Sequence, residues 1–196
     1  MNENYIHPPL PKGVERDIII GIYLYKKSTI KEPRVQLIGS GAILREVIEA
    51  ASILEKDIKI AANVLSATSF NELRKNALEI ERWNRLNPGK KKKSTHIENT
   101  ITDKKSPIIA STDYMKSFHE QISRFLPNKF IALGTDGYGR SDSREALRDF
   151  FEVNRYHVVL AAITALVDIN KIDISILLKA AKNFKLDGKK LNPINN

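Results

Sequence analysis

The sequence contains no cysteine among its 196 residues. This absence excludes disulfides, thiolate metal ligands and cysteine nucleophiles, and it fits a reducing compartment. No run approaches the roughly 18 apolar residues that a membrane-spanning helix needs. The first residues, MNENYIHPPLPKG, lack the basic start and the apolar run of a signal peptide. We therefore expect a cytoplasmic protein without a membrane partner.

Positive charge exceeds negative charge, with 32 Lys and Arg against 23 Asp and Glu and a net charge of +9. Such an excess can indicate nucleic-acid binding. The only dense basic run, at 90–93, lies in an expected loop without neighbouring aromatic residues. We interpret it as a solvated loop, with a phosphate-binding patch as the alternative, so nucleic acid is not the partner that we expect.

Prolines mark the start of the chain. Residues 1–16 predict an extended arm or interdomain linker, which is typical of a cut inside a longer chain. A folded domain at 17–192 and a frayed tail at 193–196 follow. Apolar patterning within the domain predicts strands at 17–25, 34–39, 62–69, 107–111 and 129–134.

Helical spacing of apolar residues fills most of the gaps between these strands. Helices are predicted over 40–57, over 70–86 with Ser69 and Glu72 as a capping box, after Asp113 as cap, and at 143–151, 155–169 and 174–184 with Asp173 as cap. The lone Trp83 lies on the apolar stripe of its helix and predicts packing. The alternation predicts an α/β fold: a five-stranded mixed, mostly parallel sheet with helices on both faces and the first strand antiparallel.

A glycine-rich turn, GSGAIL, follows the second predicted strand. As a dinucleotide-binding loop it fails, because Leu44 stands where the third glycine belongs and the next strand ends without a carboxylate. We interpret it as a tight turn in which Gly41 frees the backbone and Ser40 helps to cap the next helix.

A second such turn, GTDGYGRSDSREALRDFF, starts at Gly134. No Gly-Lys-Ser/Thr triplet closes it as a phosphate loop, and Asp142 replaces the third glycine of a dinucleotide loop. The spacing of Asp142 and Glu145 instead predicts a helix cap. Turn geometry leaves Tyr138 and Arg140 unexplained, and these two large side chains are our candidate interface residues.

The histidines offer no recognisable chemistry. His7, His96, His119 and His157 occur in no metal-binding spacing, and no G-x-S-x-G nucleophile elbow is present. The residues by themselves therefore predict no catalytic, cofactor-binding or metal-binding site.

Several stretches occur together in a recognisable order: NENYIHPPLPKG, VQLIGSGAILREVIEAASIL, ASTDYMKSF and LGTDGYGRSDSREALRDFFEV. They resemble the C-terminal region of the homodimeric bacterial pyruvate dehydrogenase first component, a thiamine-diphosphate-dependent family of the transketolase-like superfamily. The resemblance covers essentially the whole chain. It implies the transketolase-type C-terminal domain, with five strands, one of them antiparallel, and flanking helices.

For an intact enzyme the resemblance implies decarboxylation of pyruvate on thiamine diphosphate and Mg²⁺, then acetyl transfer to the lipoyl group of the acyltransferase component. It implies three partners for this domain: the preceding cofactor-binding domains, a second copy in a homodimer, and the acyltransferase component. The family's Gly-Asp-Gly metal motif and its activating glutamate have no counterpart here, so no catalytic, cofactor or metal residue is carried over. Two departures from the family are the shifted His7, which receives no role, and the more basic GKKKKSTHI stretch.

These observations favour a C-terminal structural and dimerisation domain. We expect it to be inactive alone, because its cofactors would be held by the preceding domains. A docking module for another component of the complex, with Tyr138 and Arg140 at the contact, is the alternative. A basic nucleic-acid-binding α/β domain is the third hypothesis.

Overall fold

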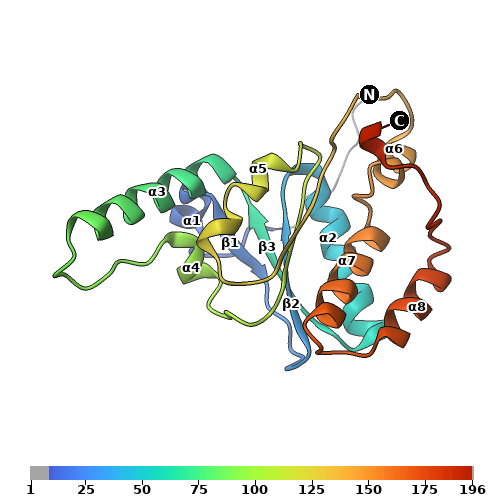
Figure 1. Cartoon of the computed structure of the whole chain (residues 1–196), viewed down its shortest axis with the longest axis horizontal. Helices are drawn as coiled ribbons and strands as arrows, with labels where there is room; N and C mark the ends of the chain where they lie inside the picture. Colours follow the sequence, from blue (N-terminus) through green and yellow to red (C-terminus); the bar gives the residue numbers. More distant parts are fainter. Residues whose placement is uncertain (1–8, 196) are drawn as a thin grey trace.

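The computed structural model describes residues 9–195 and contains one five-stranded sheet (Figure 1). The strand order is β1-β3-β2-β4-β5. Strands β2 to β5 are parallel, and β1 runs antiparallel to β3, which confirms the predicted sheet. The strands are β1 (Ile22–Lys26), β2 (Arg34–Gly39), β3 (Ala61–Ala67), β4 (Ile108–Ser111) and β5 (Phe130–Leu133).

Helices cover both faces of this sheet (Figure 1). One face carries α2 (Leu44–Ile53), α7 (Arg155–Asp168) and α8 (Ile174–Asn183). The other face carries α3 (Phe70–Leu86), α4 (His96–Thr100) and the short α5 (Ser117–Glu120). The remaining helices are α1 (Glu15–Ile20) and α6 (Arg144–Phe150), with shorter turns η1 (Gly41–Ile43), η2 (Leu54–Ile58), η3 (Ser123–Phe125) and η4 (Pro193–Asn195).

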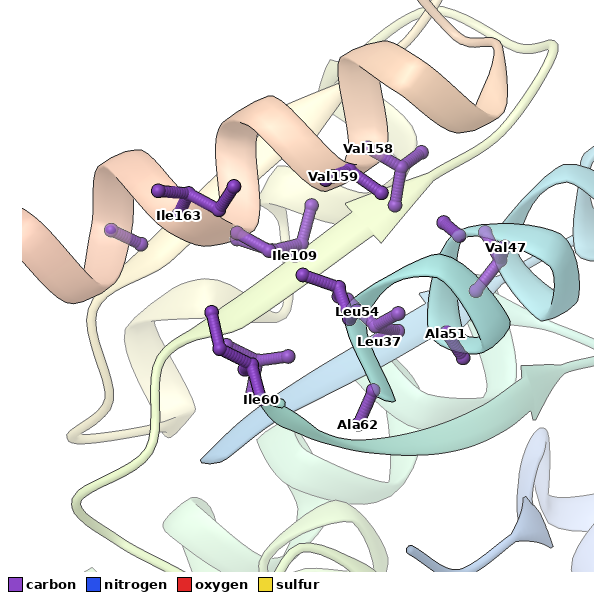
Figure 2. Close-up of a cluster of buried hydrophobic side chains, with 14 of the residues drawn as sticks. Leu37, Val47, Ala51, Leu54, Ile60, Ala62, Ile109, Val158, Val159 and Ile163 are labelled. Carbon is purple, nitrogen blue, oxygen red and sulfur yellow. The ribbon is translucent and has the colours of Figure 1, made fainter. Parts of the chain in front are cut away.

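Alternation along the strands divides the core into two layers. Leu37 and Ile109 point to the face of α2 and α7, whereas Ile38 and Ile108 point to the face of α3. Figure 2 shows the first layer, where aliphatic side chains of the sheet, α2 and α7 meet. Because the central strands are covered on both faces, nearly every residue in them is buried.

The prediction of a strand from residue 17 is wrong, because 15–20 form α1. Gly21 ends this helix in the left-handed region at φ 119°, and its N–H donates to the Asp17 carbonyl at 2.9 Å. A Cβ on Gly21 would lie 2.3 Å from the Ser69 carbonyl oxygen, so the chain can turn here only with glycine. Residues 1–8 of the predicted arm, His7 among them, lie outside the described residues.

The prediction of a long helix capped by Asp113 is also wrong. Only α5 and the turn η3 form there. The Tyr114 carbonyl accepts from Thr135 N at 2.9 Å, and Lys116 N donates to Asp136 Oδ1 at 3.0 Å. These bonds to the loop after β5 hold the backbone away from a helical path until Ser117.

The expected loop at 90–93 is followed by the helix α4, which was not predicted. Thr95 Oγ1 accepts from Glu98 N at 3.2 Å, and Glu98 Oε2 accepts from Thr95 N at 2.8 Å. This reciprocal capping box has the T-x-x-E signature in the sequence. The helix contributes Ile97 to the core.

Arg144–Asp168 is long and apolar enough to cross a membrane by length and composition alone. The segment is divided, because α6 ends at Phe150 and Asn154 caps a separate helix, α7. Residues of α7 such as Val159 and Ile163 are fully buried between the sheet and α2 (Figure 2). Packing in the core therefore accounts for the apolar content of this segment.

Candidate functional site

The two glycine-rich turns meet at the carboxyl ends of the parallel strands. Open α/β sheets bind their ligands at this end, where neighbouring connections leave in opposite directions. A groove of about 590 Å³ lies between the turns. Ala42 from the first turn and Tyr138 and Arg140 from the second contribute to its lining.

The first turn packs the start of α2 tightly on β2. A Cβ on Gly39 would lie 2.8 Å from Leu44 Cα, and Gly41 has φ 58°. Ser40 N donates to the Ser111 carbonyl at 3.2 Å, which joins the ends of β2 and β4. The predicted capping role of Ser40 is wrong, because its side chain caps no N–H within residues 9–195. The glycines here provide close approach between strand and helix.

The second turn is fixed to the loop after β4. Thr135 Oγ1 donates to the Asp113 carbonyl at 2.6 Å. A Cβ on Gly134 would lie 2.6 Å from the Tyr114 carbonyl oxygen. Gly137, at φ 92°, faces the C-terminal segment, where Ile194 Cα is 3.1 Å from its ideal Cβ position. The predicted frayed tail therefore forms the turn η4 against Gly137.

Asp142 does not cap the helix that follows. Ser143 takes this position, with its hydroxyl accepting from Ala146 N at 3.2 Å. Asp142 Oδ1 instead accepts from Ser143 N at 2.7 Å. The helix thus begins one residue later than predicted, because Ser143 keeps an extended backbone at ψ 151°.

Tyr138 and Arg140 lie on the outside of this turn. The Tyr138 side chain is 86% exposed. The Arg140 guanidinium lies 4.2 Å from the centre of the Phe150 ring on α6, a cation–π contact that fixes its direction. Both residues line the same groove, so the structure brings the two candidate interface residues together.

An ionic network around a buried carboxylate lies beside this groove and shares Arg148 with its lining. Glu46 on α2 is 5% exposed, and its carboxylate accepts from Arg148 Nη1 at 3.2 Å and from Arg155 Nε at 2.9 Å. Burial raises the pKa of Glu46, but the hydrogen bonds and charge of Arg155, with the charge of Arg148, hold it below its ordinary value. Sequence reasoning missed this network because no local pattern connects residues more than 100 positions apart.

His119 is fully buried on α5, with its ring 5.6 Å from that of Phe70. Among residues 9–195 neither ring nitrogen makes a hydrogen bond of normal geometry, although the Leu133 backbone acts to raise the pKa of the ring. Burial lowers the pKa of His119 to about 4, against the opposing charge of Asp136. The side chain is therefore a neutral part of the core at pH 7.

Cationic side chains outnumber carboxylates in the lining of the groove. Arg140, Arg144 and Arg148 line it, with Asp113 as its one carboxylate. Within 9–195, no group of three or more His, Cys, Asp or Glu side chains lies close enough to hold a metal ion. The oxygen donors that a Mg²⁺-diphosphate requires are thus not assembled in this groove.

Residues 21–154 match the family model of the transketolase-like C-terminal domain. The chain belongs to this family. A solved transketolase from Campylobacter jejuni has the same fold, with a TM-score of 0.50 and 20% identity over 74% of this chain and 18% of that one.

Two curated relatives of this transketolase-like domain are both called pyruvate dehydrogenase E1 component. The Pseudomonas aeruginosa protein is 50% identical over 99% of this chain, and the Escherichia coli K12 protein is 44% identical over 98%. In each case the match covers 22% of the relative, so the chain spans about a fifth of the length of these proteins. The chain is therefore homologous to the C-terminal portion of enzymes of this name.

Proposed function

We propose that this chain is the C-terminal structural and dimerisation domain of an acetyl-transferring pyruvate dehydrogenase. The supporting observation is 50% identity to a pyruvate dehydrogenase E1 component over almost the whole chain. The match spans 99% of the chain, so it includes the residues of both glycine-rich turns and of the core. The intact enzyme would be a cytoplasmic oxidoreductase that decarboxylates pyruvate and transfers the acetyl group to the lipoyl group of the acyltransferase component.

Thiamine diphosphate and Mg²⁺ would supply the carbanion chemistry of that enzyme, held by the preceding cofactor-binding domains. In support of this division, the groove described above offers a Mg²⁺ ion one carboxylate, Asp113, among its lining side chains. The role of this domain would be structural. The Glu46 network and the close glycine contacts would restrict motion at the carboxyl end of the sheet. A rigid end can support the neighbouring domains and the second copy of a homodimer.

Calorimetry tests this division of labour. The isolated chain would be titrated with thiamine diphosphate in the presence of Mg²⁺, with the intact Pseudomonas aeruginosa relative as the positive control. We expect heat of binding from the intact protein alone. Micromolar cofactor binding by the isolated chain would contradict the proposal.

A docking module is the second candidate function, favoured by the exposure of Tyr138. An aromatic ring that is 86% exposed beside a fixed arginine has the composition of an interface anchor. Tyr114 and Met115, on the loop bonded to this turn, are also more than half exposed. The partner would be the acyltransferase component or the second subunit. If the turn docks a partner, replacing Tyr138 and Arg140 weakens association; if the turn faces only solvent, association is unchanged.

A further inference from the structure

The C-terminal end of α3 and the loop after it project from the body of the domain and form one end of its longest axis (Figure 1). We call residues 82–93 the basic tip. Six of these twelve residues are cationic, and the stretch contains no Asp or Glu. All six cations are exposed: Arg82, Arg85, Lys90, Lys91, Lys92 and Lys93.

The basic tip has a defined conformation. Asn84 Nδ2 donates to the Lys93 carbonyl at 2.9 Å, and Lys93 N donates to Asn84 Oδ1 at 2.8 Å. These two bonds close the loop onto the helix. Asn87 Nδ2 adds a bond to the Trp83 carbonyl at 2.9 Å. The lysines are therefore carried on an ordered loop rather than on a free chain.

The Trp83 ring contacts two lysines of the run at 90–93. This run was expected to lack neighbouring aromatic residues. The Lys93 ammonium lies 4.0 Å from the centre of the indole, and the Lys90 ammonium lies 5.9 Å from it. Cation–π attraction holds both ammonium groups near the helix end. Leu86 is 59% exposed on the same tip. The tip thus presents an exposed apolar side chain and six exposed cations within twelve residues.

We propose that the basic tip is a docking surface for an acidic protein segment that carries apolar side chains. Charge complementarity selects carboxylates, and the exposed Leu86 supplies an apolar contact on the same tip. A nucleic acid fits this surface less well. Its phosphates make no apolar contact with the exposed Leu86, and the Trp83 indole, which could stack on a base, is already in contact with Lys93. This surface is distinct from the groove at Tyr138, and the inference does not depend on the proposed activity.

The test uses the full chain and two fluorescent probes, a twelve-residue peptide of Glu and Leu and a twenty-nucleotide oligothymidine. The tip variant is K90Q/K91Q/K92Q/K93Q. The matched control is K179Q/K182Q/K185Q/K189Q, which removes four exposed lysines from α8 and the segment after it. Both variants lose the same number of charges within a short stretch, and circular dichroism checks their fold.

We expect the tip variant to bind the peptide about tenfold more weakly, as four partly screened charge contacts imply, and the control to bind like the unmodified chain. Leu86→Ser should also weaken peptide binding while leaving any oligonucleotide binding unchanged. Equal losses in the two lysine variants would show attraction to net charge only. That result, absence of peptide binding, or tip-dependent binding that is tighter for the oligonucleotide would each overturn the proposal.

Discussion

Arg155 donates to the buried carboxylate of Glu46 both from its backbone N–H, at 3.0 Å, and from Nε, at 2.9 Å. One residue thereby joins the first turn of α7 to the first turn of α2. The two residues are 109 positions apart in the chain. The contact joins α2, which follows the first glycine-rich turn, to α7, which lies after the second.

Glu46→Ala is expected to reduce the free energy of unfolding by about 3 kcal/mol, because it leaves partly buried arginines without their counter-charge. Glu49→Ala is the matched control on the same helix. Glu49 is 54% exposed and lies 3.7 Å from Arg155, so its loss should cost less than about 1 kcal/mol. Urea unfolding of both variants measures the two losses of unfolding free energy. A loss for Glu46→Ala as small as that for Glu49→Ala would show that the buried network is not stabilising.

Acid should destabilise the domain through His119 before it affects Glu46. The folded-state pKa of His119, about 4, lies below its ordinary value of 6.5, so the unfolded chain binds the proton more tightly and stability falls as the pH drops from 6.5 towards 4. We expect about 2 kcal/mol to be lost between pH 7 and pH 5. His119→Leu should remove most of this loss in urea unfolding at the two pH values.

The lowered pKa of Glu46 acts in a more acidic window. Its contribution is complete above the ordinary glutamate pKa near 4.5 and is lost as the pH falls through the lower folded-state value. Glu46→Ala should therefore keep the loss of stability between pH 7 and pH 5 that His119→Leu removes. If both variants flattened this window equally, the assignment of the loss to His119 would be wrong.

Gly137→Ala should destabilise the domain by about 1–2 kcal/mol, since φ 92° is strained for alanine and the new methyl would press on Pro193 and Ile194. Gly139→Ala, two residues along the same turn, meets nothing within 4 Å and should be close to neutral. Thermal unfolding compares the pair. A larger cost at Gly139 would contradict the described packing of the C-terminal turn.

Tyr138→Ala with Arg140→Ala should weaken assembly without unfolding the domain, because one side chain is exposed and the other makes a surface cation–π contact. Arg16→Ala with Ile19→Ala is the matched control, which removes an exposed arginine and an exposed apolar residue from α1. A pull-down with the proposed acyltransferase partner and sedimentation of the proposed dimer should show at least a tenfold loss for the first variant only. Unchanged association in both assays would leave the Tyr138 turn without an interface role.

Local signals predicted the regular parts of the fold. Helix α3 occupies 70–86 as its apolar spacing indicates, and Ser69 caps it, with its hydroxyl accepting from Glu72 N. Asp173 caps α8 in the same way. Short βα turns and the short link between the first two strands were enough to predict a mixed sheet, because they restrict the possible connections.

Features set by distant partners could not be read from the sequence. The β-branched run before Gly21 predicts a strand, but the left-handed glycine and its contact with Ser69 give helix α1 an end there. The apolar spacing after Asp113 predicts a helix, but hydrogen bonds to the loop after β5 prevent helical backbone before Ser117. Of the candidate site, Tyr138 and Arg140 were found as residues that turn geometry leaves unexplained, whereas the groove between the turns depends on the folded chain.

The most direct test of the central proposal is a chimera in which this chain replaces the matching C-terminal portion of the Pseudomonas aeruginosa pyruvate dehydrogenase E1 component, to which it is 50% identical. The measurement is pyruvate-dependent acetylation of lipoyl groups, with the same protein truncated before this portion as the negative control. The account predicts a dimeric chimera with activity close to that of the parent and a truncated protein without it. A folded chimera that binds thiamine diphosphate yet neither dimerises nor acetylates would contradict it.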